Sequence, residues 1–312
     1  MTGPTVLFAA TEPRWDQYEP HLRRALDAAG VRDYRLATDL PAAEVDYIVY
    51  APNSTVQDFS VFPRLKAVLN LWAGVENVAP NPTLTVPLAR MVDEGLTRGM
   101  IEWVAGMVLR HHLGLDGVLA RQSGSWQPVV PPLARNRPVT VLGMGALGRA
   151  CAEALTQLGF PVTGWSRSAK TVPGIRTLHG PDGLETALAS AAILVLLLPL
   201  TDETRDLLDA DAFARMPRGA VVVNPGRGPL IVDRALLDAL DGGQLSHATL
   251  DVFREEPLPP DHPFWAHPGV TVSPHVASET RADTASEVIA ENIRRGEAGE
   301  PFLHLVDRGA GY

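Results

Sequence analysis

The stretch that most constrains the fold of this 312-residue chain is residues 139–149, which read Val-Thr-Val-Leu-Gly-Met-Gly-Ala-Leu-Gly-Arg. An apolar, β-branched run leads through three glycines into a helix-forming segment, which predicts a strand, a tight turn and a helix. Gly143 permits the turn, Gly145 lets the backbone approach a pyrophosphate, and Gly148 lets helix and strand pack closely. The pattern favours a dinucleotide-binding turn, although a strand, turn and helix without a ligand can have the same spacing.

Ala146 and Leu147 lie between the second and third glycines, where the chain turns into the predicted helix. The first N–H groups of a helix have no partner within it and favour anions, so we expect these residues to face phosphates. In an open α/β sheet, ligands lie beyond the carboxyl ends of the strands. Pro199 follows the strand predicted at residues 192–198, and we expect it to contact the same cofactor.

The composition argues against several classes of protein. The chain has 27 basic and 36 acidic residues, a net charge of −9 at pH 7, which disfavours nucleic acid and anionic membranes as partners. Its longest apolar run, residues 191–200, is far shorter than the roughly 20 residues that span a bilayer. The single cysteine, Cys151, cannot form an internal disulfide. We therefore expect a cytoplasmic protein, and no ligand spacing suggests a metal site.

Strand and helix patterns alternate along the chain, which predicts an α/β fold with parallel sheets. Continuous apolar strands such as residues 193–198 suit a sheet covered on both faces. At this length we expect two domains, bridged by one long helix. The predicted strands are residues 5–10, 47–50, 65–71, 86–91, 139–143, 161–165, 192–198, 220–223, 247–252 and 270–273, and the main predicted helices are residues 15–29, 97–119, 150–158 and 280–295.

The segment Ser166-Arg167-Ser168 follows the second strand of the predicted dinucleotide-binding domain. NAD-binding proteins usually have Asp or Glu here, which binds the ribose 2′-hydroxyl. The guanidinium of Arg167 can instead pair with a 2′-phosphate, with the serines and Lys170 as further donors. We therefore expect NADPH (NADP+) as the cofactor, and the alternative is that Arg167 is an ordinary surface arginine.

Three residues near the ends of predicted strands are candidates for chemistry: Arg227, Glu256 and His275. Arg227 stands between two glycines, which we interpret as room for its guanidinium to reach into a cleft. His275 follows the last predicted strand. Asp251 either supports Glu256 or caps the turn after its own strand. Nearby polar residues are interpreted as structural or solvated, namely Glu255, His262 and His267.

The turn Trp72-Ala73-Gly74-Val75 follows the strand predicted at residues 65–71. Small residues in such a turn can expose N–H groups that hold a carboxylate. An ordinary loop between a strand and a helix fits the same residues, so both interpretations stay open for this stretch alone.

Taken together, these motifs resemble the D-isomer-specific 2-hydroxyacid dehydrogenase family, in the same order and over nearly the whole chain. Within that family the chain is most similar to NADPH-dependent reductases of glyoxylate and hydroxypyruvate. The shared features are Ala73-Gly74-Val75, the glycine turn, Trp165-Ser166-Arg167-Ser168, Arg227-Gly228, residues 251–259, Pro274-His275-Val276, Val306-Asp307-Arg308 and the final Gly311-Tyr312.

The resemblance implies two Rossmann-like, doubly wound parallel-sheet domains with a cleft between them. Residues 1–98 and 278–312 would form a discontinuous, flavodoxin-like substrate-binding domain, and residues 99–277 the dinucleotide-binding domain. The resemblance also implies a homodimer, with the helix at residues 97–119 and the proline-rich loop at residues 124–138 as the contact.

The resemblance assigns the family's catalytic arginine to Arg227, its glutamate to Glu256 and its histidine to His275. Reducing a 2-oxoacid requires a proton for the carbonyl oxygen and cationic or N–H partners for the carboxylate, which these residue types supply. His275 would give the proton and Glu256 would orient its imidazole. Arg227 and the turn at residues 72–75 would bind the substrate.

Two other functions stay open. The first is reduction of a bulkier 2-oxoacid, because Trp72 is larger than the residue usual in these relatives and can reshape the pocket. Formate as a substrate is disfavoured, because formate enzymes of the family have Gln where this chain has Glu256. The second is a non-catalytic NADPH-binding regulator, against which the joint presence of Arg227, Glu256 and His275 argues.

Overall fold

The structure is a computed structural model that describes residues 3–11, 13–124 and 126–309. The Gly311-Tyr312 pair that contributes to the family resemblance lies outside these residues. Within the described ranges, no helix is long and apolar enough to cross a membrane. In the same ranges, no three or more His, Cys, Asp or Glu side chains gather as they would around a metal ion.

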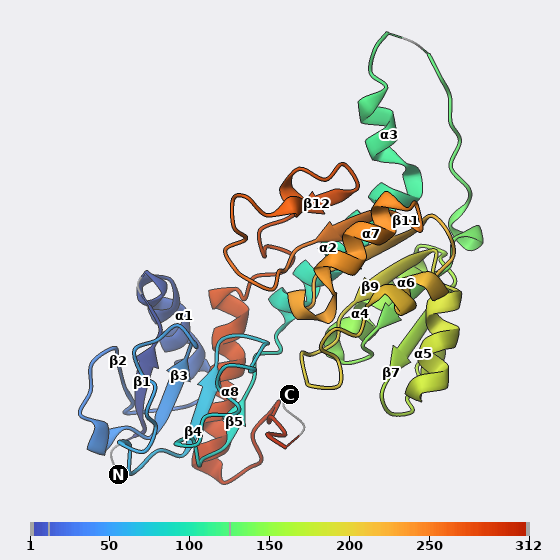
Figure 1. Ribbon diagram of the computed structural model, residues 1–312. Coiled ribbons are helices and arrows are strands. Elements are labelled where there is room, and N and C mark those ends of the chain that lie inside the picture. The colour runs from blue at the N-terminus through green and yellow to red at the C-terminus, as the bar shows by residue number, and fades with distance from the viewer. Residues whose placement is uncertain (1–2, 12, 125, 310–312) are drawn as a thin grey trace. The chain divides into compact units, whose positions relative to one another are not determined.

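The first of two compact units comprises residues 1–96 and 279–312. Its elements are β1 (Thr5–Ala9), α1 (Arg14–Ala28), β2 (Arg35–Ala37), η1 (Ala42–Glu44), β3 (Tyr47–Tyr50), β4 (Ala67–Asn70), β5 (Leu88–Ala89) and α8 (Ala282–Ala298). The strands form a parallel sheet in the order β2-β1-β3-β4-β5. Helices α1 and α8 pack together and cover one face of this sheet (Figure 1).

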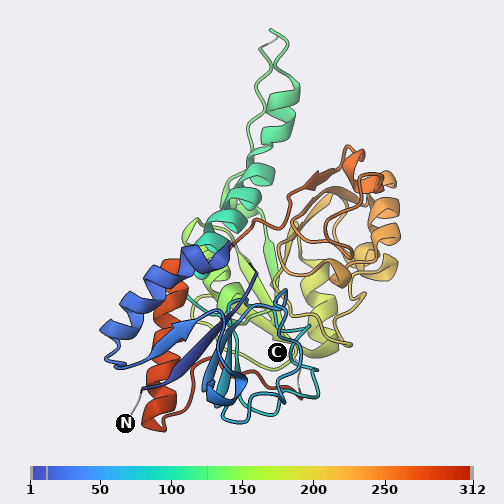
Figure 2. The same cartoon turned by 90° about the vertical axis from the view of Figure 1, so that its left-hand side faces the viewer.

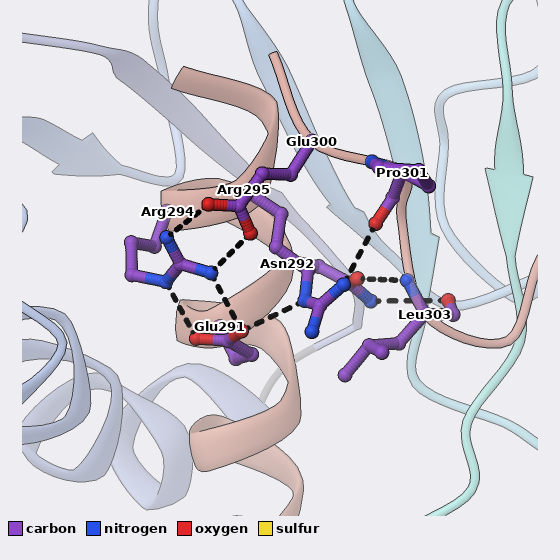
Figure 3. Close-up of polar contacts among 7 residues, drawn as sticks. All are labelled: Glu291, Asn292, Arg294, Arg295, Glu300, Pro301 and Leu303. Atoms are coloured by element: carbon purple, nitrogen blue, oxygen red, sulfur yellow. Dashed lines mark hydrogen bonds and ion pairs between the residues drawn. The ribbon is translucent and has the colours of Figure 1, made fainter. Parts of the chain in front are cut away.

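The C-terminal segment of this unit returns to the edge of its sheet. At the end of α8, Arg294 pairs with Glu291 at 2.8 Å and with Glu300 at 2.6 Å, so the helix is tied to the segment that follows it (Figure 3). Farther on, the N–H of Val306 donates to the carbonyl of Leu88 at 2.9 Å. The segment thereby covers the edge strand β5, whose backbone groups would otherwise face solvent.

The second unit comprises residues 97–278. Its elements are α2 (Glu94–Leu113), which begins in the first unit, α3 (Leu115–Ala120), η2 (Ala134–Asn136), β6 (Val139–Leu142), α4 (Ala146–Gln157), β7 (Val162–Ser166), β8 (Arg176–His179), α5 (Gly180–Ala189), β9 (Ile193–Leu196), α6 (Ala210–Arg215), β10 (Ala220–Asn224), η3 (Gly228–Leu230), α7 (Asp233–Asp241), β11 (Leu245–Leu250), η4 (Pro263–Trp265) and β12 (Val270–Val272).

All seven strands of the second unit are parallel, in the order β12-β11-β10-β9-β6-β7-β8. In β9, Leu194 and Leu196 pack into the core on one face, and Ile193 and Val195 pack into the core on the other. The predicted α/β class with two parallel sheets is confirmed, whereas the cleft and the roles assigned to the two units stay predictions. Because the strands are parallel, the segments after their carboxyl ends share one edge of the sheet.

The single long helix predicted at residues 97–119 is wrong in its bounds and continuity. Helix α2 begins earlier, at Glu94, and ends at Leu113. Gly114 then adopts a left-handed conformation with φ of 65°, which interrupts the helix before α3. Helix α3 and the described residues 121–124 after it extend away from the sheet of this unit (Figures 1 and 2).

Candidate active site

The glycine turn connects β6 to α4, and the protein itself requires two of its glycines. Gly143 has a φ of 105°, and a Cβ there would lie 2.4 Å from the carbonyl oxygen of Leu197. A Cβ on Gly148 would lie 1.7 Å from the carbonyl oxygen of Gly143. Neither position accepts a larger residue: Gly143 lets the turn pass close to the chain after β9, and Gly148 lets α4 pack against the end of β6.

Gly145 is a glycine for another reason. Its φ is −76°, which any residue adopts, and a Cβ there would meet no described atom within 4 Å. Gly145 and Ala146 are exposed at the start of α4, where none of the described side chains caps the helix. The bare backbone leaves open space before N–H groups that favour an anion. This arrangement fits the pyrophosphate of a dinucleotide.

The loop after β7 carries the residues predicted to select NADPH. Arg167 is exposed, and its Nη1 lies 2.9 Å from the carboxylate of Glu203. Lys170 donates from Nζ to the carbonyl of Met144 at 2.9 Å, which ties this loop to the glycine turn. The loop therefore brings the cationic side chain of Lys170 to the turn that fits a pyrophosphate, and it carries Arg167 a few residues earlier.

Ser166 and Pro199 shape the loops around the glycine turn. The hydroxyl of the buried Ser166 donates to the carbonyl of Ser168 at 2.9 Å. Pro199 follows β9, and its carbonyl accepts a hydrogen bond from the hydroxyl of Thr204 at 2.7 Å. Both contacts are internal to the protein, so cofactor contacts of Ser166, Ser168 and Pro199 stay predictions.

His275 follows β12 in a left-handed conformation with φ of 55°, which is uncommon for a residue with a side chain. Its N–H donates to the carbonyl of Asp251 at 2.8 Å. The buried carboxylate of Asp251 accepts from the N–H groups of Val276 at 3.0 Å and Ala277 at 2.9 Å. These bonds hold a backbone conformation that would otherwise be unfavourable. Asp251 thus shapes the turn that carries His275, a role that the sequence did not indicate.

His275 and Glu256 form a short hydrogen bond, 2.6 Å between Nδ1 and Oε2, and Oε1 of Glu256 accepts from the N–H of Phe253 at 2.9 Å. The bond to Glu256 raises the pKa of His275, against the opposing effects of burial and of Arg227. Burial alone would raise the pKa of Glu256, but the bonds from His275 and Phe253 outweigh it and lower this pKa. The imidazole side chain is 53% exposed, so Nε2 can reach another molecule while Nδ1 is engaged.

Arg227 follows β10 at the same edge of the sheet. The buried amide of Asn224 donates to the carbonyl of Arg227 at 3.0 Å and accepts from the N–H of Gly226 at 3.0 Å, which shapes this loop. The positive charge of Arg227 contributes to lowering the pKa of Glu256 and opposes the rise in the pKa of His275. The structure therefore brings together the three residues predicted to be catalytic.

The glycines beside Arg227 have a reason of their own, and the interpretation that they make room for its guanidinium stays a prediction. A Cβ on Gly226 would lie 2.8 Å from the carbonyl oxygen of Leu196, and one on Gly228 would lie 2.0 Å from the backbone of Phe253. Both glycines are required by the close approach of this loop to neighbouring backbone.

The turn Trp72-Ala73-Gly74-Val75 follows β4 in the first unit. The N–H groups of Ala73, Gly74 and Val75 donate to no acceptor among the described residues. The half-buried Trp72 packs against the core beneath α1 and α8. Free N–H groups in a turn fit the predicted carboxylate site, and the alignment of this turn with the residues of the second unit stays a prediction.

A parallel sheet with this glycine turn, and a His–Glu pair beside an arginine, are features of a nucleotide-dependent oxidoreductase. The chain belongs to the D-isomer specific 2-hydroxyacid dehydrogenase family, whose NAD binding domain matches residues 106–277.

Similar proteins cover nearly the whole chain. It is 36% identical to glyoxylate/hydroxypyruvate reductase A of Yersinia enterocolitica, over 95% of this chain and 96% of the relative. A crystal structure of a D-isomer specific 2-hydroxyacid dehydrogenase from Xanthobacter autotrophicus, in complex with NADPH and MES, is 39% identical with a TM-score of 0.92 and full coverage of both chains. An NADPH-dependent glyoxylate/hydroxypyruvate reductase from Sinorhizobium meliloti, in complex with NADP and sulfate, is 35% identical with a TM-score of 0.86, again over the full length of both.

Proposed function

We propose that this protein reduces a small 2-oxoacid, glyoxylate or hydroxypyruvate, to the 2-hydroxyacid with NADPH. The observation that carries this proposal is the 2.6 Å hydrogen bond between His275 and Glu256 beside the charge of Arg227. This arrangement favours the protonated form of the imidazole and supplies a carboxylate-binding cation. The substrates and the cofactor are those named for the relatives from Yersinia and Sinorhizobium.

The cofactor is held by the glycine turn and by the loops that follow β7 and β9. Arg167, with support from Lys170, pairs with the 2′-phosphate, because a planar guanidinium matches a phosphate through two parallel hydrogen bonds. Bound NADPH supplies the hydride for the carbonyl carbon of the substrate. The residues assigned to the cofactor are Gly143, Gly145, Ala146, Leu147, Gly148, Ser166, Arg167, Ser168 and Pro199.

The protein's own residues bind the substrate and deliver the proton. Nε2 of His275 donates the proton to the carbonyl oxygen, while Glu256 holds Nδ1 and stabilises the imidazolium. Arg227 pairs with the substrate carboxylate and polarises the carbonyl. The N–H groups of the turn at residues 72–75 also bind the carboxylate, and Trp72 limits the size of the substrate.

The protein acts as a cytoplasmic homodimer in this proposal. The single Cys151 is buried and suits a reducing compartment. The contact between two copies forms through α2, α3 and the proline-rich chain after them, where several apolar side chains are exposed. They are Leu113, Leu115, Val118, Leu119, Val129, Val130 and Leu133.

The test is NADPH oxidation with glyoxylate, hydroxypyruvate and phenylpyruvate in parallel. We expect turnover with the two small acids, and in His275→Ala a fall in kcat of roughly 10²- to 10⁴-fold with unchanged NADPH binding. Arg167→Ala should lower the preference for NADPH over NADH by about 10-fold or more, because a hydrogen bond to a charged group contributes about 1.5–3 kcal/mol. Turnover of phenylpyruvate alone would assign a bulkier substrate, and NADPH binding without any turnover would indicate a regulator.

A further inference from the structure

Asn70 lies at the carboxyl end of β4, directly before the turn at residues 72–75. Its side chain is buried, with 1% exposure. Nδ2 donates to the carbonyl of Trp72 at 2.8 Å and to the carbonyl of Gly74 at 3.0 Å. One side-chain amide thus holds two carbonyl groups of the same turn.

These two bonds determine where two N–H groups of the turn point. The carbonyl of Trp72 and the N–H of Ala73 belong to one peptide plane, and the carbonyl of Gly74 and the N–H of Val75 belong to another. In a planar trans peptide, the C=O and N–H bonds point in opposite directions. Because Asn70 draws both carbonyls toward itself, both N–H groups point away from it. The turn therefore presents two N–H groups without a protein acceptor, as an anion-binding turn requires.

The two carbonyls depend on Asn70 to different degrees. The carbonyl of Trp72 also accepts the N–H of Met91 at 3.0 Å. The carbonyl of Gly74 accepts a hydrogen bond from Asn70 and from no other donor among the described residues. The peptide between Gly74 and Val75 is therefore the one most free to rotate if the amide is removed.

The amide oxygen of Asn70 shows that keeping this side chain in its observed orientation has an energetic cost. Oδ1 of Asn70 is buried and has no hydrogen-bond partner among the described residues. An unsatisfied buried acceptor costs about 1–3 kcal/mol, and an apolar side chain at this position would avoid that cost. What Asn70 provides in return is its two donors to the turn.

We propose that Asn70 is a positioning residue that aims the N–H groups of Ala73 and Val75 at the carboxylate of the substrate. This inference rests on the proposed function, since it assigns the turn to the carboxylate of a 2-oxoacid. Asn70 does not touch the substrate itself. It acts by orienting two peptide planes.

The test compares Asn70→Ala with Asn292→Ala in the full-length protein. Asn292 is a matched control because it lies in the same unit, is also 1% exposed, and also bonds to backbone, donating to and accepting from Leu303 (Figure 3). In Asn70→Ala we expect the KM for glyoxylate to rise about 10-fold or more, with kcat changed less and the KM for NADPH within about 2-fold, since the loss corresponds to one charge-assisted hydrogen bond. Asn292→Ala should lower the melting temperature without this rise.

Binding provides a second readout. The Kd of oxalate, measured by calorimetry in the presence of NADP+, should rise in Asn70→Ala by the same factor as the KM. Asn70→Ser retains one donor, so it should give an intermediate value and serves if the alanine variant does not fold. The inference is wrong if wild-type protein reduces glyoxylate and both Asn70 variants keep the wild-type KM and oxalate Kd. If wild-type protein reduces no 2-oxoacid and binds no oxalate, the proposed function itself is wrong.

Discussion

Among its neighbours, Glu256 has the largest effect on the pKa of His275. Its pKa is raised by the hydrogen bond to Glu256, while burial and Arg227 act in the opposite direction. Because the raised pKa belongs to a group that must be protonated to act, reductive kcat/KM should be steady at low pH and decline as pH rises through this pKa. If the carboxylate of Glu256 were neutralised, burial and the charge of Arg227 would dominate and lower the pKa of His275.

We therefore expect Glu256→Gln to move the alkaline decline of kcat/KM to lower pH. The amide keeps the shape of the side chain but removes the negative charge that favours the imidazolium. Glu255→Gln is the matched control, because it makes the same change one position earlier on an exposed side chain. The measurement is the pH profile of kcat/KM for glyoxylate with saturating NADPH. Identical profiles for the two variants would remove Glu256 from this role.

At the scale of elements, two glycines of the turn between β6 and α4 have different roles: we expect Gly145 to serve NADPH binding and Gly148 to serve stability. Gly145→Ala places a methyl group where no described protein atom lies, so we expect nearly unchanged stability and weaker binding of NADPH, by roughly 10-fold or more if one phosphate hydrogen bond is lost. Gly148→Ala forces a Cβ against the backbone of Gly143, which should cost roughly 3 kcal/mol of unfolding free energy.

The measurements are a thermal or denaturant melt for stability and a fluorescence titration with NADPH for affinity. An opposite ranking, with Gly145→Ala the less stable variant and NADPH affinity retained, would contradict the assignment of the open space at Gly145 to a phosphate.

The elements that could be predicted from sequence are those with long apolar runs. Strands such as β9 have buried residues throughout, whereas β2 and β8 include exposed residues, and neither of these two strands was predicted. The break at Gly114 depends on one left-handed residue in an otherwise helical pattern. Local propensity alone cannot decide such cases, because tertiary packing overrides it.

In the candidate site, too, the sequence indicated some residues and missed the roles of others. Arg227, Glu256 and His275 could be singled out because each stands in a short motif, and their catalytic roles stay predictions. Asp251 could not be assigned correctly, because it bonds to residues 276 and 277, which are far along the chain. Asn70 has no motif of its own, and its role depends on where two carbonyls of the following turn point. A polar residue that ends a buried strand was the signal available for both.

For the whole molecule, electrostatic repulsion between two copies opposes self-association, and burial of exposed apolar side chains favours it. Each copy carries a net charge of −9, so two copies repel, and screening at physiological ionic strength limits this effect to about 8 Å. Val129 and Val130 are 67% and 88% exposed in the segment that follows α3 in the second unit. Exposed apolar side chains grouped in this way mark interaction surfaces, and burying them against a second copy would offset the repulsion.

We expect wild-type protein to sediment as a dimer, more tightly associated at higher salt because the repulsion is screened. Val130→Glu should weaken the dimer by roughly 100-fold or more, since an unpaired buried charge costs about 3–5 kcal/mol, while the fold of the monomer is unaffected. Leu158→Glu is the control, because Leu158 is an exposed apolar residue, 45% accessible, outside this segment. Analytical ultracentrifugation over a concentration series measures both. A monomeric wild-type protein, or a Val130→Glu variant that dimerises like Leu158→Glu, would show that this segment does not join two copies.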